Sequence, residues 1–134
     1  MPERPIIWYA DDDEDDRLWL KEALQRDQPK AIVVLFEHGK DLLQYASTCN
    51  SKDLPQLIVL DLNMPYLNGL EVFHALRTDD KFEPVKIAIF TTAPEKLYTY
   101  WTTEKEVLFL TKPFNSIQTE KAATTFLSYA CETA

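Results

Sequence analysis

The sequence predicts an α/β fold in which a parallel sheet of five strands is covered by helices on both faces. Five short apolar runs are rich in β-branched residues and nearly continuous rather than alternating, which is typical of strands buried on both faces. Stretches with helical periodicity follow these runs, so strand and helix alternate along the chain. The runs are Ile6–Ala10, Ala31–Phe36, Leu57–Asp61, Lys86–Thr91 and Val107–Thr111.

Five helices are expected, over Asp15–Asp27, Gly39–Cys49, Asn68–Asp79, Pro94–Lys105 and Ser116–Cys131. Most of them carry apolar residues spaced for one helix face. The third opens with Asn68 and Glu71, the spacing of a capping box. The fourth is rich in β-branched and aromatic residues, which are poor helix formers. We still expect a helix there, because parallel strands need a crossover and Pro94 suits a first turn.

Length and charge restrict the class of protein. The chain has 134 residues, enough for one domain with one core, and its 22 acidic side chains against 14 Lys and Arg give a net charge of −8. This surplus argues against nucleic acid or an anionic membrane as partner, because both are bound through clustered Lys and Arg. Two cysteines, Cys49 and Cys131, predict free thiols in a reducing cytoplasm.

The acidic surplus is concentrated in one segment, since residues 11–16 are all Asp or Glu. Asp11 and Asp12 end the first strand and Asp61 ends the third. In the strand order 2-1-3-4-5 these strands are neighbours, so the three carboxylates are expected to converge at the carboxyl edge of the sheet. Glu14, Asp15 and Asp16 are expected to serve mainly as acids at a helix start, where they favour the helix dipole.

Converging carboxylates predict a cation. Two carboxylates about 4 Å apart repel by roughly 4 kcal/mol at an effective dielectric near 20. Oxygen ligands without Cys or clustered His favour Mg²⁺. A carboxylate beside Mg²⁺ can attack a phosphoryl group, and Thr91 and Lys112, at the ends of the fourth and fifth strands, would add a hydroxyl and an ammonium.

Separated motifs in this order carry a family resemblance: Asp11-Asp12 followed by Arg17, Asp61-Leu-Asn63-Met64-Pro65 with Asn68-Gly69, Thr91, and Lys112-Pro113-Phe114. Over nearly its whole length the chain resembles the receiver domains of two-component response regulators, which have the CheY-like variant of the flavodoxin-like fold. The resemblance implies one receiver domain over residues 1–134, with no output domain. It also implies a signalling module rather than an enzyme with an independent substrate.

The resemblance implies a role for each matching residue. Asp61 would be the phosphoacceptor, and Asp11, Asp12, Asp61 and the backbone carbonyl of Asn63 would hold Mg²⁺. Thr91 and Lys112 would contact the phosphoryl group, Thr91 and Phe109 would act as switch residues, and the Lys112–Pro113 bond would be cis.

The resemblance also implies partners. A sensor histidine kinase or a histidine phosphotransfer protein would supply the phosphoryl group. Phosphorylation would then switch binding to a downstream protein through the region of the fourth and fifth strands. The aromatic segment Tyr98–Trp101 and the turn 103–106 depart from the family's usual pattern in that region.

Alternatives remain open on sequence grounds. Asp11 and Asp13, with Thr91 and Lys112, imitate a small aspartate-nucleophile phosphatase of the haloacid-dehalogenase type, which would leave Asp61 unexplained. A receiver-like interaction domain that takes no phosphate is a third reading. Taken singly, Asp61 could form a turn, Thr91 could be a strand residue and Lys112 a solvated strand end.

Overall fold

A computed structural model of the chain describes residues 4–92, 107–113 and 115–132. These residues form one parallel sheet of five strands in the order β2-β1-β3-β4-β5. The strands are β1 (Ile6–Ala10), β2 (Ile32–Phe36), β3 (Leu57–Leu60), β4 (Lys86–Thr91) and β5 (Val107–Thr111). The predicted fold class and strand order are therefore confirmed.

Four α-helices lie within the described residues: α1 (Glu14–Asp27), α2 (Gly39–Thr48), α3 (Gly69–Arg77) and α5 (Ser116–Cys131). Two short 3₁₀ turns accompany them, η1 (Ser51–Asp53) and η2 (Asp80–Phe82). The sequence predicts five helices, so that number is not what this part of the chain shows. The expected helix Pro94–Lys105 and the aromatic segment Tyr98–Trp101 lie outside the described residues.

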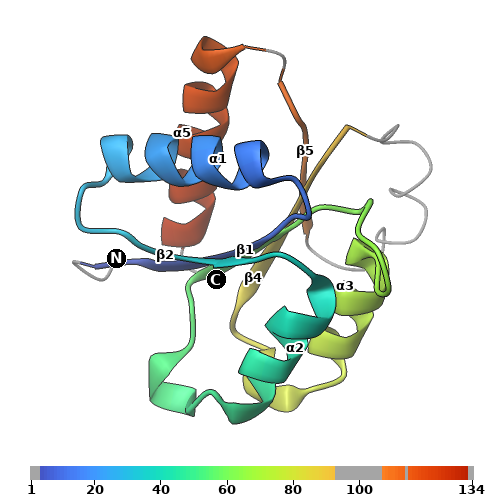
Figure 1. Cartoon of the computed structure of the whole chain (residues 1–134). Coiled ribbons are helices and arrows are strands. Elements are labelled where there is room, and N and C mark those ends of the chain that lie inside the picture. The colour runs from blue at the N-terminus through green and yellow to red at the C-terminus, as the bar shows by residue number, and fades with distance from the viewer. Residues whose placement is uncertain (1–3, 93–106, 114, 133–134) are drawn as a thin grey trace.

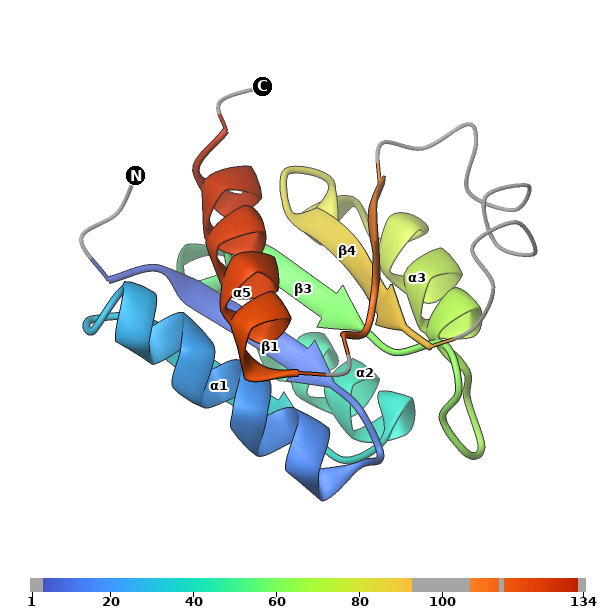
Figure 2. The ribbon, with the colours of Figure 1, turned by 90° about the horizontal axis from the view of Figure 1, so that it is seen from above.

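The helices form a layer on each face of the sheet. Figure 1 shows α1 and α5 on one face and α2 and α3 on the other, and Figure 2 shows α1 and α5 side by side above the strands. Each strand contributes side chains to the hydrophobic core on both faces of the sheet, because successive side chains point to opposite faces. In β1, Ile7 and Tyr9 pack toward α1 and α5, while Trp8 and Ala10 belong to the core under α2 and α3.

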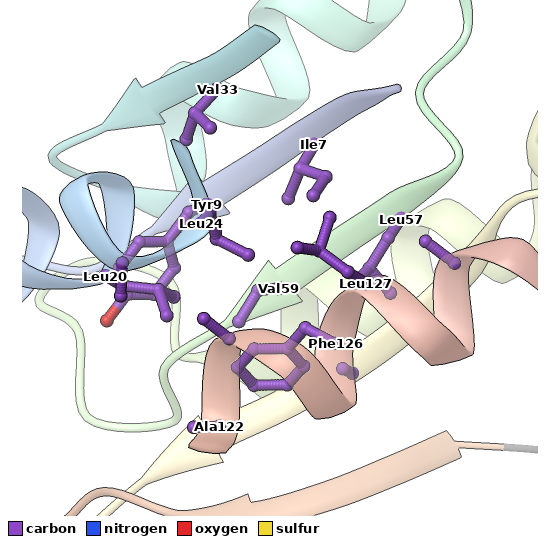
Figure 3. Packing of buried hydrophobic residues seen from close by; sticks show 14 of the residues in the cluster. Ile7, Tyr9, Leu20, Leu24, Val33, Leu57, Val59, Ala122, Phe126 and Leu127 are labelled. Atoms are coloured by element: carbon purple, nitrogen blue, oxygen red, sulfur yellow. The ribbon is translucent and has the colours of Figure 1, made fainter. Parts of the chain in front are cut away.

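Apolar stripes on the helices complete these two cores. Figure 3 shows the first core, where Leu20 and Leu24 of α1 and Phe126 and Leu127 of α5 close over the strands. The nearly continuous apolar strands are thus explained by burial on both faces. Among the described residues, none of the helices combines the length and the apolar character that crossing a bilayer requires.

Side-chain caps fix where the helices begin. Asp13 precedes α1 and accepts a hydrogen bond from the backbone N–H of Asp16 at 3.0 Å. Asn68 and Glu71 form the predicted capping box at the start of α3. Asp13 closely follows β1, and the start of α3 at Gly69 lies against the backbone of Asp61, so α1 and α3 begin at the carboxyl edge of the sheet, where the site residues lie.

Candidate phosphoryl-acceptor and metal site

Three site residues are placed by backbone hydrogen bonds that prolong the sheet beyond its strands. The N–H of Asp11 donates to the carbonyl of Phe36 at 3.1 Å, and that of Asp61 donates to the carbonyl of Ala10 at 3.0 Å. The N–H of Lys112 donates to the carbonyl of Thr91 at 2.9 Å. The predicted convergence therefore results from the strand order, because the ends of β1, β3, β4 and β5 meet at one edge.

The three predicted metal ligands form one acidic cluster. Carboxylate oxygens of Asp11, Asp12 and Asp61 lie within 4.8 Å of one another. Asp11 and Asp61 are buried, whereas Asp12 is exposed at the rim. Buried like charges at this separation repel each other, so the cluster calls for positive charge.

Lys112 supplies positive charge within the protein itself. Its Nζ lies 2.6 Å from Oδ2 of Asp11 and 3.3 Å from Oδ2 of Asp61, and it is also 2.8 Å from Oδ2 of Asp16 on α1. Burial acts to lower the pKa of this ammonium, but the hydrogen bonds with Asp11 and Asp16 and the charges of Asp11 and Asp61 outweigh it. The net effect raises the Lys112 pKa above its ordinary value, so the side chain stays protonated.

The surroundings of Asp61 raise the pKa of its carboxyl group. Burial, followed by the nearby charge of Asp11, raises its pKa from 3.8 to about 6, although Lys112, the Asn63 N–H and the Thr91 side chain act in the opposite direction. The Asn63 N–H donates to Oδ1 of Asp61 at 3.3 Å. With a pKa of about 6 the carboxylate is mostly ionised at neutral pH, the form in which an oxygen can attack phosphorus.

Asp11, in contrast, is held on both carboxylate oxygens. Its Oδ1 accepts from the N–H of Asp13 at 2.9 Å, and its Oδ2 accepts from the hydroxyl of buried Tyr9 and pairs with Lys112. Its backbone carbonyl accepts from the guanidinium of Arg17 at 2.7 Å. Asp13 is engaged as the cap of α1. These contacts disfavour the phosphatase reading, in which Asp11 is the nucleophile and Asp13 its partner.

The residues present fit a divalent cation. Three carboxylates lie within reach of one another, two of them buried, and no Cys or His of the described residues joins them. This is an oxygen donor set of the kind that suits Mg²⁺. Lys112 offsets part of this negative charge with a single positive charge.

The two remaining predicted site residues lie on β4 and β5. Thr91 is buried at the end of β4 and hydrogen-bonds to Asp61 through its side chain. Phe109 is half-buried on β5, where it pairs in register with Ile89 and packs against the core under α2 and α3.

Two residues make contacts in the site that were not predicted from the sequence. Asp16 lies in the first turn of α1, as expected of an acid at a helix start, but its carboxylate also contacts Lys112. Asp16 lies four residues before Leu20, on the side of α1 that faces the core. This spacing could have shown that Asp16 lies on the inner face of the helix, although it does not give the contact with Lys112. Tyr9 lies two residues before Asp11 and so on the same face of the sheet. This alternation could have suggested that the Tyr9 hydroxyl lies on the same side as the Asp11 carboxylate.

One expectation about the backbone is wrong. The described residues contain no cis peptide bond, so the Lys112–Pro113 bond is trans rather than cis.

A comparison with protein families decides which family this geometry represents. The family model described as "Response regulator receiver domain" matches residues 7–124. The chain belongs to this family. A sequence relative, the sensory transduction protein LytT of Oceanobacillus iheyensis, is 32% identical over 105 residues, which cover 76% of this chain and 41% of LytT.

The receiver is shorter than the curated relatives it matches. Besides LytT, these include the histidine kinase P4 of Formosa agariphila, 26% identical over 114 residues, and the chain spans only 8% of that kinase. The receiver therefore corresponds to one part of these longer signalling proteins.

Solved structures confirm the fold along almost the entire chain. The phosphorylated cyanobacterial phytochrome response regulator RcpA has a TM-score of 0.82 and 22% identity, with 98% of this chain and 96% of RcpA covered. The Mn²⁺-bound response regulator Rcp1 has a TM-score of 0.81 and 22% identity, with 97% and 96% covered.

Proposed function

We propose that this receiver accepts a phosphoryl group on Asp61, with Mg²⁺ held by Asp11, Asp12, Asp61 and the backbone carbonyl of Asn63. The observation that carries the proposal is the meeting of three carboxylates, Lys112 and Thr91 at one sheet edge. It is supported by RcpA, solved in a phosphorylated form, and by Rcp1, solved with Mn²⁺. When bound, Mg²⁺ would offset the charge on the transferring phosphoryl oxygens.

In the proposed transfer, an oxygen of Asp61 forms a bond to phosphorus while the bond between phosphorus and the donor's leaving atom breaks. The bonding electrons leave with the donor, which is a phosphorylated histidine of a sensor kinase or of a phosphotransfer protein. Lys112 then pairs with a phosphoryl oxygen and Thr91 donates a hydrogen bond to another. These roles follow from the contacts that both side chains already make with the Asp61 carboxylate.

The consequence of phosphorylation would be a change of partner affinity. We propose that the new charge on Asp61 shifts a two-state equilibrium of β4 and β5 through Thr91 and Phe109, and so alters binding of a downstream protein in the cytoplasm. The chain would act as a signalling unit that turns over no independent substrate and binds neither nucleic acid nor membrane.

The test is phosphate incorporation from a small acyl-phosphate donor, acetyl phosphate, in the presence of Mg²⁺. We expect the mass of the intact protein to increase by one phosphoryl group, and we expect peptide mapping to place that group on Asp61. Asp61→Asn should abolish the increase, and a chelator should suppress it in the wild type. An increase that persists in Asp61→Asn but disappears in Asp11→Asn would favour the phosphatase instead, whereas no increase in the wild type would indicate a receiver that takes no phosphate.

A further inference from the structure

Lys112 is shared among three carboxylates that come from three different elements. Asp11 follows β1, Asp61 follows β3, and Asp16 lies in the first turn of α1. Asp11 and Asp61 are two of the three residues that would hold Mg²⁺, but Asp16 is not in that cluster. The ammonium therefore contacts two prospective metal ligands and one carboxylate outside the set.

This arrangement makes Lys112 and a metal ion competitors for the carboxylates of Asp11 and Asp61. Oδ2 of Asp11 lies only 2.6 Å from Nζ of Lys112, so a cation that approaches this oxygen must displace the ammonium. The Lys112 side chain is only 9% exposed, and a buried ammonium without a counter-ion is strongly disfavoured. Lys112 can leave Asp11 at low cost only if another carboxylate continues to pair with it.

Asp16 is the carboxylate outside the metal cluster that pairs with Lys112. We propose that Asp16 is a positioning residue. It keeps its ion pair with Lys112 when Asp11 and Asp61 bind a metal ion and the phosphoryl group. Its carboxylate is already 2.8 Å from Nζ, and its side chain is 26% exposed, so it can hold the ammonium toward the rim of the site. This inference rests on the proposed function and deepens it, because it explains how one lysine serves the site both before and after a metal ion is bound.

The first experiment measures Mg²⁺ affinity by titration calorimetry on the full chain, for the wild type, Asp16→Asn and Asp15→Asn. Asp15 is the matched control, because it lies in the same helical turn, is exposed, and loses the same charge. A half-buried ion pair has an energy between those of exposed and buried pairs, so we expect Asp16→Asn to bind Mg²⁺ about three- to tenfold more weakly than Asp15→Asn. Asp16→Glu, which keeps the charge, should recover most of the affinity.

A second experiment isolates the role of Lys112. In a Lys112→Met background the ammonium is absent, so Asp16→Asn should weaken Mg²⁺ binding no more than Asp15→Asn does. Circular dichroism establishes that each variant is folded. If Lys112→Met does not fold, the comparison of Asp16→Asn, Asp15→Asn and Asp16→Glu in the wild-type background decides the question.

The outcomes separate this inference from the proposed function. If the wild type binds Mg²⁺ and incorporates phosphate but Asp16→Asn behaves like Asp15→Asn, only the role of Asp16 is overturned. The same holds if the effect of Asp16→Asn persists undiminished in the Lys112→Met background. A wild type that neither binds Mg²⁺ nor takes phosphate would overturn both.

Discussion

At the scale of a single residue, the ionisation of Asp61 affects both the chemistry of the site and the stability of the fold. Its pKa is raised to about 6 in the folded protein, chiefly by burial, from an ordinary value of 3.8. The folded state therefore binds a proton at Asp61 more tightly than the unfolded state does. This contribution to stability is fully present below pH 3.8 and is lost as the pH rises through about 6.

Asp61→Asn should consequently be more stable than the wild type at neutral pH in a metal-free buffer. The amide resembles the neutral carboxyl group, so we expect a gain of up to about 3 kcal/mol above pH 7 that shrinks toward zero near pH 4. Urea unfolding of both proteins at the two pH values, with chelator present, measures this difference.

The control for this prediction is Asp27→Asn, at an exposed aspartate at the end of α1, outside the site. It should show no comparable pH-dependent gain. An Asp61→Asn gain of the same size at both pH values would contradict the argument, because it would have a cause other than proton binding at Asp61.

Residues at strand ends could be predicted from the sequence, but side-chain partners could not. Asp11, Asp61 and Lys112 follow apolar runs directly, and the strand order then brings them together. The contacts of Tyr9 and Asp16 depend on the distances between β1, α1 and Lys112 in three dimensions, which periodicity does not give. Periodicity gives only the face on which each residue lies.

At the scale of elements, the junction of β3 and α3 controls the position of Asp61. Gly69, the first residue of α3, lies against the backbone that carries Asp61. A Cβ at this position would lie 2.4 Å from the Asp61 carbonyl oxygen and 3.0 Å from Cα of Leu62. Only glycine allows the helix to begin so close to the strand end.

Gly69→Ala should therefore destabilise the protein by about 1–3 kcal/mol, the usual cost of overpacking, and should slow phosphate incorporation by displacing Asp61. Gly39→Ala is the matched control. Its closest contact, with Cγ2 of Val72 at 2.4 Å, is with a side chain, and its closest backbone contact, with the carbonyl oxygen of Leu67, is longer, at 3.1 Å. Urea unfolding and the acetyl phosphate assay should show the smaller effect for Gly39→Ala; equal effects would contradict the proposed role of Gly69.

The elements themselves were predicted well wherever burial dictates the pattern. The sequence-based bounds of β1, β4 and β5 match the structure, and those of β2 and β3 differ by one residue at one end. Helix ends depend on local capping instead. The first helix begins at Glu14, one residue earlier than expected, because Asp13 caps it. The predicted helix Pro94–Lys105 stays a prediction.

At the scale of the whole molecule, the net charge of −8 includes a local excess that metal binding would relieve. Mg²⁺ should therefore raise the stability of the fold, since any ligand that binds only the folded state does so. At about twenty times its dissociation constant the expected gain is about 2 kcal/mol, measured as a rise in the melting temperature.

Sodium chloride at the same ionic strength is the control, because screening alone also weakens carboxylate repulsion. Asp12→Asn, which removes the exposed member of the cluster, should reduce the Mg²⁺ response. If sodium chloride stabilises the protein as much as Mg²⁺ does, the effect is screening and not binding.

The hydrogen bonds that prolong the sheet under Asp11, Asp61 and Lys112 have one more consequence. Backbone N–H groups in a central sheet exchange their protons with water only when the sheet itself opens. We therefore expect slow exchange at Asp11 and Asp61, which follow the central strands β1 and β3, and faster exchange at Lys112, which follows the edge strand β5. The proposed rearrangement on phosphorylation would then be confined to side chains and to β4 and the edge strand β5, while the backbone at Asp11 and Asp61 keeps its place.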